Sequence, residues 1–544
     1  MESEQRRKRK RSYKPNSQPH FLSLRLLMVC LSFLVLPLFL SSSRFPIRTV
    51  HFHPLLSVSS FSILSKISLQ GCLRGESRLP LVVEDRVLFP DHLLLLVSGE
   101  VYQADKLDCV YYKALNDSAE VSEESKEKVF IEHGVLSVDE YDGFISIVRC
   151  PLPPLNYSAT AALRWRGDNV YRSSSLSTNR TVHSWDRMVY EAAVDGETVV
   201  VFVKGLNLRP HGVSNPTRFR CRFGLGSRGE DEGFVMVTKA VAAAQEVVRC
   251  SLPRTIRNNP YKAQGIRVSL VHASDRGAQG EPNRMPSVAK LYNSESYMKK
   301  RSGEIIEELD FLDYNVSRHA WPWIKTQEAG FSHCALRARD ECKWVAFFDV
   351  DEFYYFPRHH RRGLLGPNSL RSLVANYSSS TTIAEIRTVC HSFGPSGLTS
   401  PPSQGVTVGY TCRLQSPERH KSIIRPDLLN ETLLNVVHHF QLRKGFKYLN
   451  VHESSMLINH YKYQVWDTFR TKFFRRVATY VVDWQENQNQ GSKDRAPGLG
   501  TEAIEPPNWR LQFCEVWDTR LRDFVLANLA DPATGALPWE KPVL

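Results

Sequence analysis

The sequence lacks the closely spaced cysteine pairs of structural zinc sites. Its 544 residues include eleven cysteines, but none forms a Cys-x-x-Cys pair, so we expect no structural zinc. The sequence also lacks a stripe of lysine and arginine interleaved with aromatic residues, which argues against a nucleic-acid partner. The net charge of +13 does not change this, because residues 1–14 alone carry seven basic and two acidic side chains. The remaining excess fits a solvated surface of mixed charge, the alternative being attraction of an acidic polysaccharide.

Long hydrophobic runs are scarce, with one exception near the start of the chain. Residues 26–40 are mostly apolar and follow a basic segment. A membrane span needs about 20 residues, and counting from Phe21 reaches this length by including Arg25. Positive charge before an apolar segment keeps that flank cytosolic. We therefore predict a cytosolic tail over residues 1–20, a transmembrane signal-anchor over 21–42 and a stem over 43–91. The alternative is a cleavable signal peptide, but Ser41–Ser43 followed by Arg44 is a poor cleavage site.

The rest of the chain carries signs of a glycosylating, oxidising compartment. Beyond the apolar segment lie six Asn-x-Ser/Thr sequons, at Asn116, Asn156, Asn179, Asn315, Asn376 and Asn430. Such sequons are acceptors for N-glycosylation. Besides Cys30 there are ten cysteines, an even number that is compatible with luminal disulfides, although their pairing cannot be derived from sequence. We expect a luminal protein that is single-pass and type II.

Residues 92–290 are predicted to be a β-rich, β-sandwich-like module. Short apolar runs at 93–96, 144–148, 199–203, 234–237 and 247–248 are separated by turn residues, which is typical of antiparallel strands. Two similar phrases, at residues 147–153 and 247–253, each contain Val-Arg-Cys and end in Leu-Pro. They indicate two related β units, with coincidence as the alternative.

From residue 291 to 544 the pattern predicts an α/β domain. Residues 315–317 are expected to form a strand, 327–339 a helix, and the apolar residues 344–348 a central, buried strand. This last run ends in Asp349, Asp351 and Glu352. Alternate strand residues share a side, so Asp349 and Asp351 are predicted to lie together. Hard carboxylate oxygens suit Mn²⁺ or Mg²⁺ carrying a diphosphate. The alternative is an acidic loop that caps a strand.

Several downstream residues are candidates for the rest of such a site. The third metal ligand is expected to be His460, which follows an apolar run, with His438 and His439 as alternatives. Alternation along a strand would place Lys421 and Arg425 on one face toward a donor diphosphate. The expected base that deprotonates the acceptor is Glu418 or Asp467. A sugar platform is predicted from aromatic residues and a glycine loop: Trp321, Trp323, Phe393, Gly394 and Gly397.

Five motifs carry a family resemblance. They are Trp-Pro-Trp at 321–323, Phe-Asp-Val-Asp-Glu-Phe at 348–353, Phe-Gly-Pro-Ser-Gly at 393–397, Lys-Ser-Ile-Ile-Arg-Pro at 421–426 and His-Tyr-Lys-Tyr at 460–463. Together they resemble the plant members of glycosyltransferase family 92, which include galactan β-1,4-galactosyltransferases. The resemblance implies a type II Golgi membrane protein with a Rossmann-like GT-A catalytic domain, an inverting mechanism, Mn²⁺ or Mg²⁺ and a UDP-sugar donor. It also implies that the β-rich module resembles a carbohydrate-binding domain, and that Asp351 holds the metal while Asp349 contacts the metal or the ribose.

The chain departs from the family at the start of the catalytic domain. Family members carry a strand, a helix and a strand before the Asn-Val-Ser-Arg-His phrase, whereas this chain has only a mostly polar stretch, residues 291–303, and the predicted helix at 304–309. We therefore expect a GT-A domain that is truncated at its start. The main hypothesis is a metal-dependent transferase that moves galactose from a UDP-sugar to a pectic polysaccharide acceptor. The alternative is a catalytically inactive luminal protein that binds glycan or acts as a scaffold. A homodimer is an open alternative to a monomer.

Overall fold

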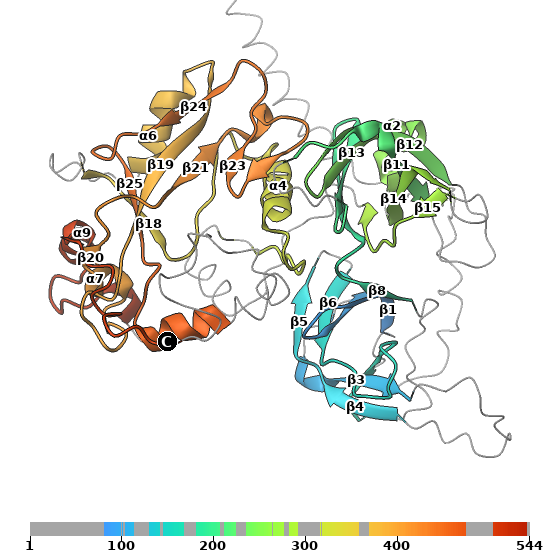
Figure 1. The fold of residues 1–544 in the computed structure, drawn as a ribbon, viewed down its shortest axis with the longest axis horizontal. Coiled ribbons are helices and arrows are strands. Elements are labelled where there is room, and N and C mark those ends of the chain that lie inside the picture. The colour runs from blue at the N-terminus through green and yellow to red at the C-terminus, as the bar shows by residue number, and fades with distance from the viewer. Residues whose placement is uncertain are drawn as a thin grey trace, which may run out of the picture. The chain divides into compact units, whose positions relative to one another are not determined.

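The computed structural model describes part of the chain (Figure 1). The described residues run from 81 to 540, with gaps at 99–100, 102–103, 114–129, 142–144, 168–180, 207–211, 225–234, 264, 277–281, 292–315, 317, 358–368 and 475–503. The predicted tail and signal-anchor lie outside these residues, as does most of the predicted stem. The stem prediction extends too far, because strand β1 (Val82–Leu88) lies within residues 43–91 and has a mostly buried side-chain pattern.

The first described region is a β unit with two sheets. A five-stranded sheet has the order β5-β6-β2-β1-β8, and a three-stranded sheet has the order β4-β3-β7. The strands are β2 (Leu93–Ser98), β3 (Leu107–Tyr112), β4 (Phe130–Gly134), β5 (Ser137–Glu140), β6 (Ile145–Cys150), β7 (Ala162–Trp165) and β8 (Val182–Ser184). Apolar residues of both sheets form one buried core. A disulfide between Cys109 of β3 and Cys150 of β6 joins the two sheets.

The second region is a β unit built from one long path of strands, in the order β15-β14-β11-β12-β13-β10-β9, with β16 on β14. The elements are β9 (Val189–Asp195), β10 (Thr198–Val203), β11 (Phe219–Gly224), β12 (Met236–Ala244), β13 (Val247–Ser251), α2 (Arg254–Asn258), β14 (Ile266–Arg276), β15 (Pro282–Arg284) and β16 (Lys290–Leu291). Strand β12 pairs with β11 along its first half and with β13 along its second. The sheet encloses its own core, and a disulfide joins Cys221 of β11 to Cys250 of β13.

The two similar sequence phrases occupy matching places in these units. Cys150 lies at the end of β6 and Cys250 near the end of β13, and each is bonded to a cysteine of an earlier strand. The strands expected at residues 93–96, 144–148, 199–203, 234–237 and 247–248 are present, with ends shifted by a few residues. The region is therefore β-rich as predicted, and its described strands form two β units, as the two similar phrases indicate, in place of one single sandwich.

The third region is an α/β unit around a mixed sheet of order β17-β21-β19-β25-β18, with β24 on β19. Its elements include α4 (Gln327–Ala338), β17 (Val345–Ala346), β18 (Glu352–Tyr355), α6 (Ser369–Ser378), β19 (Ile383–Ser392), β21 (Arg419–Ile424), β22 (Asn435–Val436), β23 (His439–Phe440), β24 (Lys447–Asn450) and β25 (Leu457–His460). The predicted helix over 327–339 is confirmed. Helix α6 lies against the sheet beside β19 and β24 (Figure 1), where Leu373 packs with Ile386 and Ile423.

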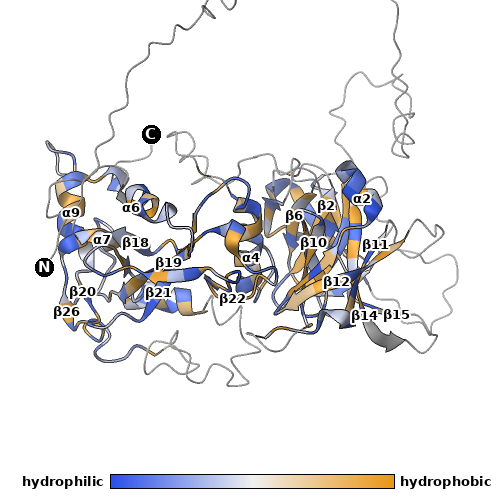
Figure 2. Cartoon of the chain, turned by 90° about the horizontal axis from the view of Figure 1, so that it is seen from above, coloured by the Kyte–Doolittle hydropathy of each residue, from blue (hydrophilic) through white to orange (hydrophobic). Residues whose placement is uncertain are grey.

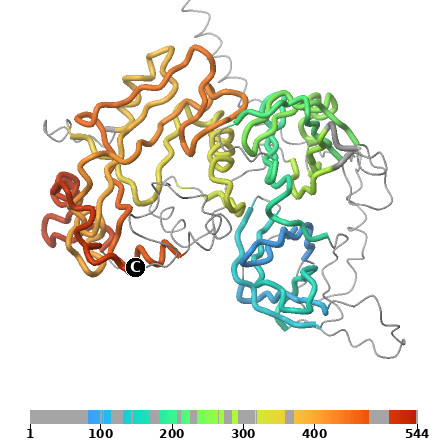
Figure 3. Tube along the Cα trace, in the orientation of Figure 1, coloured from blue at the N-terminus to red at the C-terminus, as the bar shows by residue number. Residues whose placement is uncertain are grey.

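The C-terminal residues complete this unit. They include α7 (Val406–Gly409), β20 (Cys412–Arg413), β26 (Val516–Trp517) and α9 (Arg520–Asn528). The disulfide between Cys412 and Cys514 and the pairing of β20 with β26 bring the end of the chain back to residues 406–414 (Figure 3). Leu521 and Val525 of α9 contribute to the same core as Phe393.

The predicted central strand at residues 344–348 is wrong in two respects. Strand β17 has only two residues, and in the described part of the chain it pairs on one side alone, with β21. Phe348 is 54% exposed, and residues 350–351 form a turn. The apolar run resembles a central strand, but a central place needs a neighbouring strand on each edge, and the described residues supply only β21. The strand expected at 315–317 is also absent at Val316, the one residue of the three that is described.

Hydropathy along the described elements is that of packed sheets and amphipathic helices. Figure 2 shows hydrophobic and hydrophilic residues side by side on α4, whose Ala329, Ala335 and Leu336 are buried. Among the residues that the structure describes, no helix has the length and hydrophobicity needed to cross a bilayer.

Candidate functional site

Four strand ends meet at one edge of the α/β sheet. Strands β19 and β25 run parallel, and their last residues, Ser392 and His460, are partners in register. Strand β18 is antiparallel to β25 and begins with Glu352 opposite His460. Strand β21 begins with Arg419 opposite Cys390. Ligands in α/β sheets gather at such carboxyl ends of strands, so polar side chains at this edge are candidates for function.

The loop from β17 to β18 brings three carboxylates to this edge: Asp349, Asp351 and Glu352, which we call the carboxylate cluster. The two strands lie at opposite ends of the sheet path, so the loop passes over the ends of the strands between them. A turn bond from the amide of Glu352 to the carbonyl oxygen of Asp349 (3.1 Å) shapes the loop. A turn, and not the alternation of an extended strand, therefore places these residues: Asp349 contacts Lys421, and Asp351 contacts Lys472.

Lys421 of β21 joins two members of the cluster. Its Nζ donates to Asp349 Oδ2 at 3.0 Å and lies 3.1 Å from Glu352 Oε2. The backbone amide of Asp349 also donates to Glu352 Oε2, at 2.9 Å. Burial alone lowers the pKa of Lys421, but Glu352 and Asp349 more than offset this and raise the pKa above its ordinary value. The ammonium group therefore stays charged between two carboxylates, as the prediction for Lys421 requires.

His460 joins Glu352 to the third member of the cluster, Asp351. Its Nδ1 lies 3.5 Å from Glu352 Oε1, and its Nε2 lies 3.6 Å from Asp351 Oδ1. Lys472, on helical residues 466–474, donates to Asp351 Oδ2 at 2.6 Å. Burial alone raises the pKa of Asp351, but hydrogen bonds from His460 and Lys472 hold it well below its usual range. Asp351 is consequently an ionised carboxylate that is 14% exposed.

The donor set suits a hard divalent cation. Ligand atoms of Glu352, Cys390 and His460 lie within 4.8 Å of one another, and Asp351 borders the same histidine. Burial raises the pKa of the Cys390 thiol well above its ordinary value, so the thiol stays neutral and is a poor metal ligand. Carboxylate oxygens with one imidazole remain, and such a set fits Mn²⁺ or Mg²⁺ better than a soft metal.

Of the two candidate bases, Glu418 lies at the sheet edge. It accepts hydrogen bonds from Ser392 Oγ (2.5 Å), Tyr463 OH (3.2 Å) and Lys462 Nζ (3.3 Å). Since Ser392 is the register partner of His460, Glu418 is close to the end of β25. Asp467 is 87% exposed and pairs with Arg470.

Three other predicted ligands are engaged by other partners, although His438 lies close enough to Lys421 and Asp349 to interact with them electrostatically. Arg425 follows the far end of β21, opposite the end that carries Lys421, and pairs with Asp427 at 3.1 Å. The two basic residues share a face, but four residues of strand separate them by about 13 Å. His439 Nδ1 contacts Ser422 and the buried Glu385, and His438 Nε2 contacts the carbonyl oxygen of His420 at 2.6 Å. Among the three histidines, only His460 has an ion pair with the carboxylate cluster in the described part of the chain.

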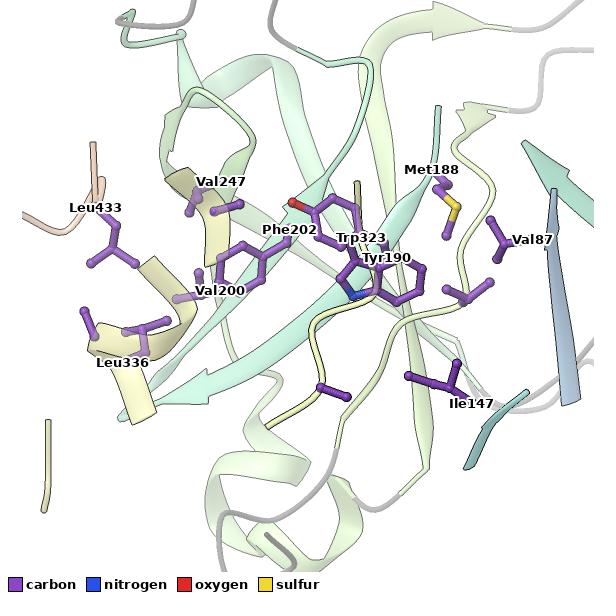
Figure 4. Packing of buried hydrophobic residues seen from close by; sticks show 14 of the residues in the cluster. Val87, Ile147, Met188, Tyr190, Val200, Phe202, Val247, Trp323, Leu336 and Leu433 are labelled. Carbon is purple, nitrogen blue, oxygen red and sulfur yellow. The ribbon is translucent and has the colours of Figure 1, made fainter. Parts of the chain in front are cut away.

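The predicted sugar platform is not assembled. Trp323 is 5% exposed and packs with Tyr190 at a ring distance of 5.3 Å, within a core that also holds Phe202 (Figure 4). Trp321 is partly buried against the same core. Phe393 is fully buried in a different core. Sequence patterns do not distinguish a buried aromatic ring from an exposed one, and here tertiary packing covers Trp323 and Phe393.

The glycine loop beside Phe393 is packed. Gly394 lies so close to Phe513 that a side-chain carbon at this position would be 2.8 Å from Phe513 Cβ. Gly397 has a φ of +86° and donates its amide to the carbonyl oxygen of Arg510. The glycine loop is thus held against the C-terminal segment through Phe513 and Arg510.

Three of the six sequons fall in the described residues. Asn156 is exposed in a turn with a φ of +71°, and Asn376 is exposed on α6. Asn430 is half-buried and accepts hydrogen bonds from the amide and hydroxyl of Thr432, its own sequon threonine. Asn116, Asn179 and Asn315 lie outside the described residues.

Glu352 was predicted from the sequence only as the third carboxylate after the apolar run, with no role as a ligand, and Lys472 was not predicted at all. Glu352 directly follows the Asp-x-Asp pair, so its place at the start of a strand was a signal that could have identified it. Lys472 lies 121 residues from Asp351, and no local pattern connects the two.

Comparisons with known proteins agree on one family. A family model described as glycosyltransferase family 92 matches residues 291–511. A glycosyltransferase family 92 protein of Ricinus communis is 56% identical over 587 residues, which cover 99% of this chain and 100% of the relative. One of Arabidopsis thaliana is 51% identical over 592 residues, with 99% of each chain covered. One of Oryza sativa subsp. japonica is 39% identical over 525 residues, covering 86% of this chain and 84% of the relative.

Proposed function

Because this chain belongs to glycosyltransferase family 92 and is a glycosyltransferase, we propose that it moves galactose from a UDP-sugar to a pectic, galactan-like glycan, with inversion and with a divalent metal. The observation that carries this proposal is the carboxylate cluster with His460 at the ends of four strands. The plant origin of the relatives supports a cell-wall acceptor.

The metal would be held by Asp351 and His460, with Asp349 or Glu352 completing the set. A divalent cation there would neutralise the negative charge that a diphosphate gains as it leaves the sugar. Asp351 contributes an ionised carboxylate, and the hydrogen bonds that lower its pKa keep it so. Lys421 contributes a fixed positive charge beside Asp349, next to the space where a donor diphosphate would lie.

Glu418 is our candidate for the group that accepts the proton of the acceptor hydroxyl. Its carboxylate lies at the same sheet edge as His460, and hydrogen bonds from Ser392 and Tyr463 fix its orientation. A base must be held within reach of the proton that it removes, and this carboxylate is held by three donors. Asp467 has less support, because its side chain is 87% exposed and in the described part of the chain pairs with the exposed Arg470 at 3.7 Å.

The wider setting of the proposal rests on the sequence. The apolar segment at 21–42 supports a single-pass type II anchor, and the sequons and disulfides support the Golgi lumen. A GT-A domain is supported by the mixed sheet with a carboxylate loop at its strand ends. A glycan-binding role for the β-rich region, and a homodimer, remain proposals from resemblance.

A second candidate function is that of an inactive luminal protein that binds glycan. The observation that favours it is the end of the described sheet at β17, which has two residues and one neighbour. The alignment with the Ricinus relative has 587 positions, whereas this chain has 544 residues. At least 43 residues of the relative are therefore aligned with a gap in this chain. A missing strand and helix beside β17 would remove part of a nucleotide-binding surface.

The experiment that separates the two candidates is sugar transfer by the purified full-length chain. UDP-galactose, Mn²⁺ and a galacto-oligosaccharide acceptor are supplied to the wild type, to Asp351→Asn and to Asp340→Asn, a matched change at an exposed aspartate. We expect transfer in the wild type and in Asp340→Asn, and a loss on the order of 100-fold or more in Asp351→Asn. A folded wild-type chain without transfer would favour the binding protein.

A further inference from the structure

Asp351 is already bound to a positively charged side chain, that of Lys472. Their 2.6 Å contact joins the loop after β17 to helical residues 466–474. The second oxygen of Asp351 faces His460. A cation that binds Asp351 would therefore meet an ammonium group on the same carboxylate, and two like charges at such a distance repel each other.

The two lysines of the site differ in their freedom to move. Lys421 is 9% exposed and pairs with both Asp349 and Glu352. When a cation binds one of these two carboxylates, Lys421 keeps its ion pair with the other. Lys472 is 40% exposed, and among the described residues its ion pair is with Asp351 alone. A lysine side chain has a long flexible stem, so Lys472 can swing away from Asp351 while Lys421 stays.

We infer that Lys472 is a donor-binding residue that changes partner: it binds Asp351 in the donor-free enzyme and the diphosphate of the nucleotide-sugar in the loaded enzyme. This inference rests on the proposed function, because it needs a cation and a diphosphate at the carboxylate cluster. The diphosphate supplies the negative charge that Lys472 gives up when the cation takes Asp351. Nucleotide and cation therefore strengthen each other's binding, and this coupling is reciprocal.

The test measures binding and does not depend on turnover. Mn²⁺ binding to the full-length chain is followed by the loss of the free-ion signal in electron paramagnetic resonance, with and without UDP. In the wild type we expect UDP to raise Mn²⁺ affinity at least on the order of fivefold. In Lys472→Gln we expect Mn²⁺ alone to bind more tightly than in the wild type. We also expect UDP to raise Mn²⁺ affinity by a smaller factor than in the wild type, because only the direct attraction between the cation and the diphosphate remains.

Two further variants serve as controls. Lys472→Arg keeps the charge and should keep the coupling. Arg470→Gln removes an exposed positive charge from the same helical segment, where it pairs with Asp467, and should leave both affinities unchanged.

The possible results separate the inference from the proposed function. Equal coupling in the wild type and Lys472→Gln overturns the inference, whether or not the chain transfers sugar. A coupling that depends on Lys472 in a chain that transfers no sugar supports the inference and refutes the proposed function. A folded wild type that binds neither Mn²⁺ nor UDP overturns both.

Discussion

Glu385 is a fully buried carboxylate at the centre of the sheet that carries the site. It lies on β19 and accepts hydrogen bonds from Ser422 Oγ (2.6 Å), His439 Nδ1 (2.9 Å) and both Nε (2.9 Å) and Nη2 (3.0 Å) of Arg387. Burial alone raises the pKa of Glu385, but the bonds from His439, Arg387 and Ser422 lower it to about 2, from an ordinary value of 4.5. We predict that this carboxylate stabilises the sheet in a pH-dependent way.

The sign of the pH dependence of stability follows from the direction in which the pKa of Glu385 is shifted. Because the pKa is lower in the folded protein, the stabilisation is fully present above pH 4.5 and is lost as the pH falls toward 2. The difference of about 2.5 pKa units corresponds to about 3 kcal/mol at about 1.4 kcal/mol per unit. Glu385→Gln removes the titrating group and also leaves Arg387 without its bidentate partner. The variant should lose about 3 kcal/mol at pH 7 and lose no further stability from this position in acid.

Hydrogen exchange of peptides that cover β19 and β21 measures the free energy of opening of this part of the sheet. Measurements between pH 7 and pH 3 on the wild type and Glu385→Gln give the pH dependence that the side chain contributes. Glu341→Gln, a matched change at an exposed position, should behave as the wild type. Parallel pH profiles for the wild type and Glu385→Gln would refute the reasoning, because the ionised carboxylate would then add nothing to the folded state.

Three other changes test the assignment of structural residues. Trp323→Ala should cost about 3–5 kcal/mol of stability in denaturant unfolding and leave the KM for acceptor unchanged, because the ring is a core residue; a raised KM with normal stability would restore it as a sugar contact. Cys150→Ser should destabilise the first β unit by about 4 kcal/mol, from the chain entropy of the 41-residue loop that the disulfide closes; unchanged resistance of residues 81–184 to limited proteolysis would contradict this. Gly394→Ala should cost about 1–3 kcal/mol, since the new methyl group would meet Phe513 at 2.8 Å; hydrogen exchange around Phe513 should rise, and unchanged exchange would show that the loop has room.

Local patterns in the sequence predicted much of the fold. Apolar runs between turn residues located strands such as β2, β10 and β13, and helical periodicity located α4. The site was predicted in part, because Asp351, His460 and Lys421 each lie at the end of a strand-like segment. These are properties of single segments, which a sequence displays directly.

The predictions that were wrong or missing depend on which segments become neighbours in the folded chain. The run before Asp349 looks like a central strand, but a central place needs a second neighbouring strand, and the described residues supply only β21. Arg425 shares a face with Lys421, yet only the sheet register shows that it lies beyond the opposite end of β21. Lys472 reaches Asp351 through tertiary packing alone. No spacing in the sequence encodes such a contact.

The most direct test of the account is a crystal structure of the full-length chain with Mn²⁺ and UDP, in which anomalous scattering locates the metal. The account predicts one Mn²⁺ in contact with the carboxylate of Asp351 and the imidazole of His460, with the UDP diphosphate beside it. UDP bound elsewhere, or Mn²⁺ away from these two residues while Lys472 still holds Asp351, would contradict the claim that this sheet edge is the donor site.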